Sequence, residues 1–260
     1  MVIVRVMARI LYHVISLGVA LLAFRSTMAA TECPFGNFQV QWTSSPATRK
    51  PDDLQKEMRA LVLAKDEVQQ LQIWKEGKPR NGAPASLSCA DYVQQNQSAL
   101  SPDSLGEWNW HGATWKSSQF LKDCLGMYLV SKAKPARYDC FAGFHLDPSA
   151  ASVLPSTLGL IITSVGRRGM SEAKNLRTWA PMMRFSIGES GELIGKQEGA
   201  RFQEDHFAGI AFGDFDGDGY QDLLLSIRDI SAGSYGELRL GVLSRKTSSG
   251  ILYHVFATKR

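Results

Sequence analysis

Four aspartates within the stretch 214–222 are the residues of this chain whose type and spacing most clearly suggest chemistry. Counted from Asp214 as position 1, carboxylates occupy positions 1, 3, 5 and 9, and Gly219 occupies position 6, where the chain must bend sharply. Calcium takes about six to eight oxygen ligands at roughly 2.3–2.6 Å, so carboxylates at alternate positions of a tight turn can converge on one ion. The sequence therefore predicts a calcium site whose ligands are the side chains of Asp214, Asp216, Asp218 and Asp222 and the carbonyl of Tyr220.

The residues beside this loop indicate strands rather than helices. An EF-hand would require a glutamate at position 12 and a helix on either side, whereas position 12 here is Leu225. Ile210 and Phe212 alternate with other residues before the loop, and Leu223, Leu225 and Ile227 alternate after it. Because this period of two is typical of half-buried strands, we expect a strand-turn-strand arrangement.

The run GDFDGDGYQDLLL resembles the calcium loop of the FG-GAP (VCBS-type) repeat, which occurs in integrin-alpha-like propellers and in many secreted bacterial proteins. The resemblance covers roughly residues 207–242 and includes Gly236–Leu240 as the next strand of the repeat. It implies a bound calcium ion, blade-like antiparallel strands and a role in binding other proteins. The alternative is a solvated acidic turn without a metal, which is disfavoured because four neighbouring carboxylates would repel one another.

The first 29 residues have the pattern of a secretory signal peptide. Arg5 and Arg9 form the basic region, residues 10–24 are an apolar stretch, and Ala29 and Ala30 are small residues suited to cleavage. The apolar stretch is shorter than the roughly 20 residues that span a bilayer, so an uncleaved membrane anchor is the weaker alternative. We expect export to a periplasm or to the extracellular space, with no membrane attachment after cleavage.

The formal net charge of +4 belongs mostly to this leader. Residues 1–29 contain Arg5, Arg9 and Arg25 and no acidic residue, so the rest of the chain has 26 basic and 25 acidic residues. A nearly balanced chain lacks the positive electrostatic footprint of a nucleic-acid-binding protein. Nucleic acid is therefore not expected as a partner.

All four cysteines follow the leader, and an even number in an exported chain predicts two disulfide bonds. Their spacing contains no C-x-x-C, so neither a zinc ribbon nor a thioredoxin-type redox site is expected. Three pairings remain open among Cys33, Cys89, Cys124 and Cys140.

Three helices are predicted in the first half of the mature chain. The first begins at Pro51, with acidic residues directly after it, and ends near Gly77. The second is short and begins with a capping pair formed by Ser88 and Asp91. The third is the clearest, because apolar residues recur every four positions across 120–129, which predicts a helix that packs in the core.

We therefore expect an α+β protein with an α-rich, disulfide-containing domain at residues 30–145 and an antiparallel β domain at residues 146–260. A buried strand is predicted at 158–165 and a hairpin at 183–194. The segment 158–194 is interpreted as a degenerate repeat that lacks the aspartates and should bind no metal. Two repeats are too few to close a propeller, so the β domain should resemble partial β-propeller blades.

No sequence motif of a serine hydrolase, zinc protease, P-loop or dinucleotide-binding enzyme occurs, so the chain is not expected to be an enzyme. Glu204, Asp205 and His206 could form an acid-base cluster, but three adjacent polar residues are more often a solvated bend. An aromatic cluster is formed by Trp108, Trp110, His111 and Trp115. We expect these residues either to pack in the core or to form a flat surface that binds a sugar.

These patterns predict an exported, calcium-stabilised module that binds a protein partner without catalysis. Two alternatives remain open. One is a periplasmic immunity protein that neutralises an interbacterial toxin, based on a similarity of the run from Cys89 to Arg137 to small exported bacterial proteins. The other is an exported glycan or cell-wall hydrolase, which would require Trp108 and Trp110 in a cleft beside paired carboxylates.

Overall fold

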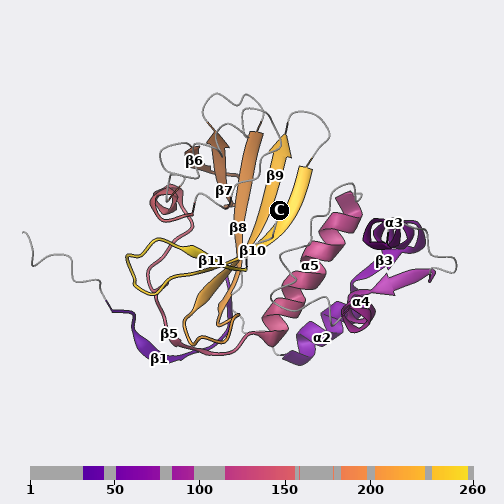
Figure 1. Ribbon diagram of the computed structural model, residues 1–260, viewed down its shortest axis with the longest axis horizontal. Coiled ribbons are helices and arrows are strands. Elements are labelled where there is room, and N and C mark those ends of the chain that lie inside the picture. Colours follow the sequence, from indigo (N-terminus) through magenta and orange to yellow (C-terminus); the bar gives the residue numbers. More distant parts are fainter. Residues whose placement is uncertain are drawn as a thin grey trace, which may run out of the picture. The chain divides into compact units, whose positions relative to one another are not determined.

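The computed structural model describes residues 32–43, 51–76, 84–96, 115–155, 158, 178, 183–197, 203–231 and 236–256 (Figure 1). The predicted signal peptide, most of the aromatic cluster and most of the predicted strand 158–165 lie outside these residues. The described helices are α2 (Pro51–Ala60), α3 (Lys65–Glu76), α4 (Cys89–Gln95), α5 (Trp115–Lys132) and the 3₁₀ helix η3 (Pro148–Ser152). The described strands are β1 (Phe35–Phe38), β2 (Gln41–Trp42), β3 (Val62–Ala64), β4 (Ser86–Ser88), β5 (Ala136–Tyr138), β6 (Met183–Ile187), β7 (Leu193–Gln197), β8 (Gln203–Gly213), β9 (Asp222–Ser231), β10 (Gly236–Ser244) and β11 (Tyr253–Phe256).

A mixed α+β architecture with antiparallel sheets is thus confirmed. The main sheet has seven strands, and β6 to β11 pair in chain order, which makes this part an antiparallel meander (Figure 1). The two smaller sheets pair β1 with β5 and β3 with β4. The described strands therefore form open sheets, and no closed propeller is present among them. No described helix is both long enough and apolar enough to cross a membrane.

One edge of β8 is shared by two partner strands. Strand β7 pairs with β8 from Glu204 to Phe207, and β2 pairs with β8 at Ala211 and Phe212. A β-bulge interrupts the ladder to β9 between these two regions, beside Gly209. A bulge bends its strand and changes the direction of the following side chains. The edge of β8 therefore contacts β7 before Gly209 and β2 after it, and Gly209 lines the pocket described below.

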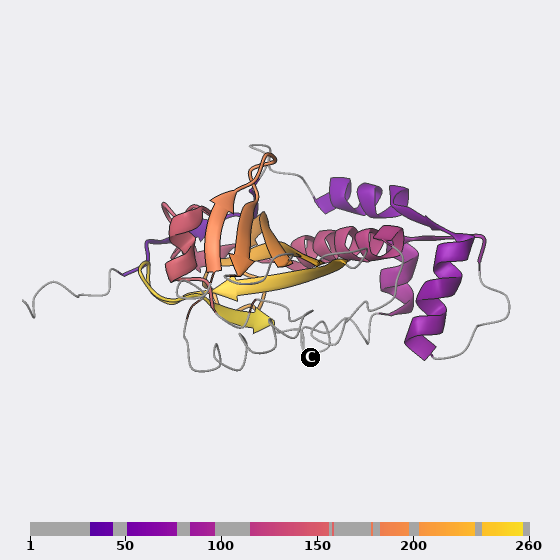
Figure 2. The same ribbon diagram turned by 90° about the horizontal axis from the view of Figure 1, so that it is seen from above.

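Strand β9 is buried on both faces. Leu225 packs in one core together with Phe207 of β8, whereas Leu224 packs in a second core with Leu54 of α2 and Leu129 of α5. The prediction of a half-buried strand is wrong here, because apolar side chains of α2 and α5 pack with Leu224 on the second face of the sheet. Figures 1 and 2 show α5 running beside the sheet. Burying a leucine side chain fully contributes about 1.5–3 kcal/mol, so both faces of β9 stabilise the fold.

The predicted core helix is confirmed as α5. Its buried residues Phe120, Leu121 and Leu125 pack in a third core with Met58 of α2 and Val68 of α3. Farther along the same helix, residues 129 and 130 pack against the sheet. Helix α5 therefore belongs to two cores and connects the helical part to the sheet.

The single helix predicted from Pro51 to near Gly77 is wrong, because strand β3 divides it into α2 and α3. Strand β3 pairs with β4, and Leu63 lies opposite Leu87. Leu63 is buried, whereas its neighbour Val62 is 52% exposed, as expected for side chains that alternate along a strand. Pairing with β4 satisfies backbone groups that would otherwise bond within a helix, and no local pattern reveals this long-range contact.

Two disulfide bonds are present, as predicted, and the structure selects one of the three pairings. Cys33 bonds to Cys140, which follows β5. Cys89, the first residue of α4, bonds to Cys124 in α5. Each bond joins segments that lie far apart in the sequence, so both bonds restrict the unfolded chain.

Two local predictions are confirmed. Ser88 caps α4, because its hydroxyl oxygen accepts a hydrogen bond from the main-chain N–H of Asp91 at 3.1 Å. The hairpin predicted at 183–194 is the β6–β7 pair, in which Ile187 lies opposite Leu193. Both features depend on residues close together in the sequence, which explains why the local pattern was sufficient.

Candidate functional site

The acidic loop joins β8 to β9, which confirms the strand-turn-strand arrangement. One carboxylate oxygen from each of Asp214, Asp216 and Asp218 lies within 4.8 Å of the other two. Oxygens that coordinate calcium at roughly 2.3–2.6 Å lie at most about 5 Å from one another across the ion. The spacing of these three carboxylates therefore fits a single calcium ion.

Asp214 holds the loop in its bent conformation. Its two carboxylate oxygens accept hydrogen bonds from the main-chain N–H groups of Gly217 at 2.6 Å and Gly219 at 3.0 Å. Both glycines have positive φ, 82° and 89° respectively, a region that residues with a Cβ rarely adopt. The sequence pattern identified the bend at Gly219 and overlooked the one at Gly217, although the repeated Asp-Gly pair signals both.

Asp222, the fourth predicted carboxylate, begins β9 and is completely buried. It is not part of the group of three, but one of its oxygens accepts a hydrogen bond from the main-chain N–H of Phe215 within the loop at 2.9 Å. Its other oxygen makes no hydrogen bond of ordinary geometry with the described residues, although the Ser244 hydroxyl lies close enough to favour its charged form. A buried carboxylate oxygen without a donor is costly unless a cation or a proton satisfies it.

Burial raises the pKa of Asp222 to about 7, against the lowering effect of the Ser244 hydroxyl and the Phe215 N–H. The charges of Asp216 and Asp218 raise it further. Burial is also the main cause that raises the pKa of Asp216, followed among the raising effects by the charges of Asp218 and Asp214. These carboxylates disfavour one another's charge, and a bound cation would reverse this effect.

The predicted fifth ligand, the carbonyl of Tyr220, stays a prediction, whereas the side chain of Tyr220 has a different role. Its ring stacks on the ring of Tyr138, with centroids 4.8 Å apart. The ammonium of Lys246 lies 4.0 Å from the centroid of the Tyr220 ring and also contacts the carboxylate of Asp218. Lys246 lies 28 residues after Asp218, so no local pattern connects the two.

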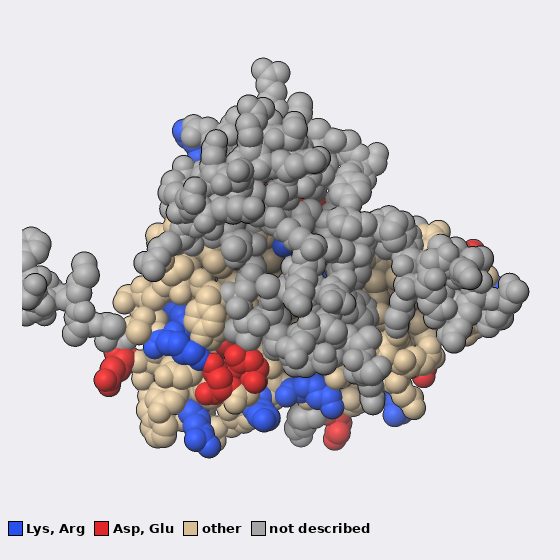
Figure 3. Space-filling model, viewed as in Figure 1, with Lys and Arg blue, Asp and Glu red and all other residues tan. Residues whose placement is uncertain are grey.

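The loop is bound to the segment that follows α5. Lys134 and Asp214 exchange main-chain hydrogen bonds of 2.9 and 3.0 Å, and the carbonyl of Gly219 accepts from the N–H groups of Arg137 and Tyr138. In Figure 3 acidic side chains gather at one place on the visible face, with lysine and arginine side chains beside them. An ordered loop therefore also orders the chain between α5 and the disulfide at residue 140.

The second predicted cluster, Glu204, Asp205 and His206, is not the solvated bend that was expected. These residues lie in strand β8, so Asp205 faces one side of the sheet and its two neighbours face the other. Asp205 is only 2% exposed. The three residues therefore do not form one acid-base cluster.

Asp205 belongs instead to a buried charged group that the sequence did not suggest. It lies opposite Asp229 on β9, and the guanidinium of Arg239 donates two hydrogen bonds, of 2.8 and 3.0 Å, to the Asp229 carboxylate. Arg239 also donates to the carbonyl of Leu158 at 2.8 Å. Burial, followed by the charge of Asp229, raises the pKa of Asp205 well above its usual value. Asp205 therefore keeps its proton to a higher pH than an exposed aspartate does.

The aromatic cluster lies mostly outside the described residues. Trp108, Trp110 and His111 are not described, and Trp115 is the first residue of α5. The requirement of the hydrolase alternative for two exposed tryptophans beside paired carboxylates thus stays a prediction.

Comparisons with known proteins do not extend the resemblance. No protein-family model, no curated protein and no solved structure matches this chain. The similarity to the FG-GAP repeat therefore rests on the sequence of residues 207–242 alone.

Proposed function

We propose that the protein is an exported, calcium-stabilised module of the FG-GAP type that binds a protein partner and has no catalytic activity. The observation that supports this proposal best is the convergence of carboxylate oxygens from Asp214, Asp216 and Asp218 within 4.8 Å. The complete burial of the Asp222 carboxylate, which bonds to the main-chain N–H of Phe215 in the loop, agrees with a cation nearby. In this proposal the four aspartates hold the ion, and the carbonyl of Tyr220 completes the ligand set.

The bound ion would stabilise the folded protein. Calcium sites of extracellular modules have dissociation constants of about 10⁻⁴–10⁻³ M. With calcium at about ten times the dissociation constant, the folded state gains about 1.4 kcal/mol. Because the loop bonds to Lys134, Arg137 and Tyr138, this energy also stabilises the connection between α5 and the sheet.

We propose that the protein lies outside the cytosol and that its main sheet is related to a propeller blade. Two disulfide bonds are typical of an oxidising compartment, which agrees with the predicted leader. The meander from β8 to β11 has four antiparallel strands, the composition of one blade. We propose that these strands correspond to the single intact repeat, and that β6 and β7 belong to its degenerate copy.

Calorimetric titration with calcium tests the metal site. The purified protein with both disulfides formed should bind calcium, and the variant Asp216→Asn plus Asp218→Asn should not. The matched control is Asp52→Asn plus Asp53→Asn, which removes two exposed aspartates from α2 and should bind like the wild type. Saturating calcium should raise the melting temperature by about 3–5 °C, and magnesium should do so less. No binding heat from the wild type would reject the calcium site.

Capture from a cell-envelope extract tests the binding role separately. A protein partner should be retained on the immobilised wild type in calcium and released by a chelator. The Asp216→Asn plus Asp218→Asn variant should retain less of the same partner than the control variant. Equal retention by both variants, with and without chelator, would separate partner binding from calcium and reject this part of the proposal.

A further inference from the structure

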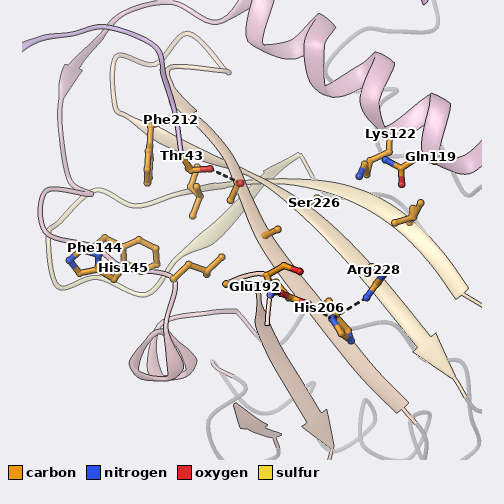
Figure 4. A pocket seen from close by; sticks show the side chains of 17 residues that line it. Thr43, Gln119, Lys122, Phe144, His145, Glu192, His206, Phe212, Ser226 and Arg228 are labelled. Atoms are coloured by element: carbon orange, nitrogen blue, oxygen red, sulfur yellow. Dashed lines mark hydrogen bonds and ion pairs between the residues drawn. The ribbon is translucent and has the colours of Figure 1, made fainter. Parts of the chain in front are cut away.

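A pocket of about 750 Å³ lies between α5 and the strands β8 and β9, away from the acidic loop. Its lining comes from α5, the turn between β6 and β7, the segment after β5, and the edge of β8 where β7 pairing ends (Figure 4). A volume of this size is typical of a site for a small organic ligand. None of the aspartates of the loop lines it, so it is a separate site.

One part of the pocket is cationic. Lys122 of α5 and Arg228 of β9 line it, and Figure 4 shows both beside the space between helix and sheet. Among the described lining residues Glu192 is the only acid. One of its oxygens accepts a hydrogen bond from the main-chain N–H of Ser190 at 3.1 Å, and the other lies 3.4 Å from the Nδ1 atom of His206.

Arg228 lacks a carboxylate partner among the described residues. One terminal nitrogen of its guanidinium lies 3.3 Å from the Nδ1 atom of His206, so at most one of its five N–H donors is used within the described residues. Lys122 is only 17% exposed and is partly neutralised by Asp123, 3.3 Å away, which does not line the pocket. The described lining residues therefore provide two cationic side chains, Lys122 and Arg228, and one acidic side chain, Glu192. A planar guanidinium suits bidentate contact with a carboxylate, sulfonate or phosphate.

The opposite part of the pocket is apolar and aromatic. Phe144 and Phe212 line it, together with Leu146 and Leu223. The rings of Phe144 and Phe212 both pack on Phe141, with centroids 5.4 and 5.5 Å from it, which fixes their positions. Figure 4 shows these two rings on the side of the pocket away from Lys122 and Arg228.

We propose that this pocket binds a small amphipathic anion, with an acyl or aromatic body against Phe144 and Phe212 and an acidic group at Arg228 and Lys122. The two ends match the two halves of such a molecule. The acidic group provides a partner for Arg228, which has no carboxylate partner within the described part of the chain, and the apolar body displaces water from the aromatic wall. This ligand site is independent of calcium and of the proposed protein partner.

Two fluorescent probes that differ in one anionic group test the proposal. The purified full chain, with both disulfides formed, is titrated with 1-anilinonaphthalene-8-sulfonate and with its uncharged analogue N-phenyl-1-naphthylamine. The sulfonate should bind at one site and more tightly than the uncharged analogue. Arg228→Gln should weaken sulfonate binding by about tenfold, the loss of one hydrogen bond to a charged group, and leave the uncharged analogue unchanged.

Further variants keep the test decisive if Arg228→Gln is poorly folded, which thermal unfolding will show. Lys122→Gln should also weaken sulfonate binding selectively. Lys116→Gln, at an 81% exposed position of the same helix outside the pocket, has the same change of charge and should bind like the wild type.

Displacement of the sulfonate by decanoate or by 2-naphthoate will decide between an acyl and an aromatic body. Displacement by neither carboxylate would overturn the proposal. Equal affinity for the two probes, or wild-type binding by both Arg228→Gln and Lys122→Gln, would also overturn it.

Discussion

Replacement of Arg239 by methionine should destabilise the protein by about 3–5 kcal/mol at neutral pH. Arg239 is 5% exposed, and its guanidinium bonds to the Asp229 carboxylate and to the carbonyl of Leu158. Methionine fills a similar volume, so the loss comes mainly from a buried carboxylate without a counter-charge and a carbonyl without a donor. For a domain that is stable by about 5–15 kcal/mol, this is a large part of the total.

Urea unfolding of the wild type and of Arg239→Met, measured from pH 4 to pH 8, checks this prediction. The deficit of the variant should shrink as the pH falls, because protonation removes the buried negative charge. The second variant Asp229→Asn and the double variant complete a double-mutant cycle, in which the double variant should recover part of the loss. A cost below about 1 kcal/mol, or a deficit that does not depend on pH, would refute the assignment of a buried ion pair.

Three other changes have defined outcomes. The pKa of Asp205 is raised in the folded state, so its protonated form stabilises the protein below about pH 3.9, and this contribution is lost as the pH rises. Asparagine does not ionise, so thermal unfolding should show that Asp205→Asn becomes more stable relative to the wild type between pH 4 and pH 8. The ammonium of Lys246 competes with calcium for the carboxylate of Asp218, and Lys246→Met removes this competitor. One exposed charge contributes ~1 kcal/mol, so calorimetry should show about fivefold tighter calcium binding by the variant. Removal of the Cys89–Cys124 bond by alanine at both positions should lower the free energy of unfolding by about 3.8 kcal/mol in urea titration, from the entropy of a loop with a separation of 35 residues; no change would exclude a stabilising role for the bond.

The composition of the acidic loop made part of the site predictable. Carboxylates at alternate positions with glycine between them favour a tight turn in which they converge, so Asp214, Asp216 and Asp218 were identified from spacing alone. The position of Asp222 was also predicted, but its complete burial was not. Burial of Asp222 depends on the strands beside it, and those strands are distant in the sequence.

Errors arose where a distant segment competed with the local pattern. The helix expected across 51–77 is divided because β3 finds a partner in β4. Strand β9 is buried on both faces because α2 and α5 cover one of them. In both cases the local signal was correct about which residues are apolar and wrong about what they contact.

By itself the sequence determined the features that depend on near neighbours: the acidic turn between two strands, the Ser88 cap, the β6–β7 hairpin and the core helix α5. These features follow from hydrogen bonds and apolar periodicity over a few residues. Only the tertiary structure decided the disulfide pairing, the contact of Lys246 with Asp218, and the burial of Arg239 beside Asp229. Each of these joins residues from separate elements, so its partners become neighbours only when the helices pack on the sheet and the strands align in register.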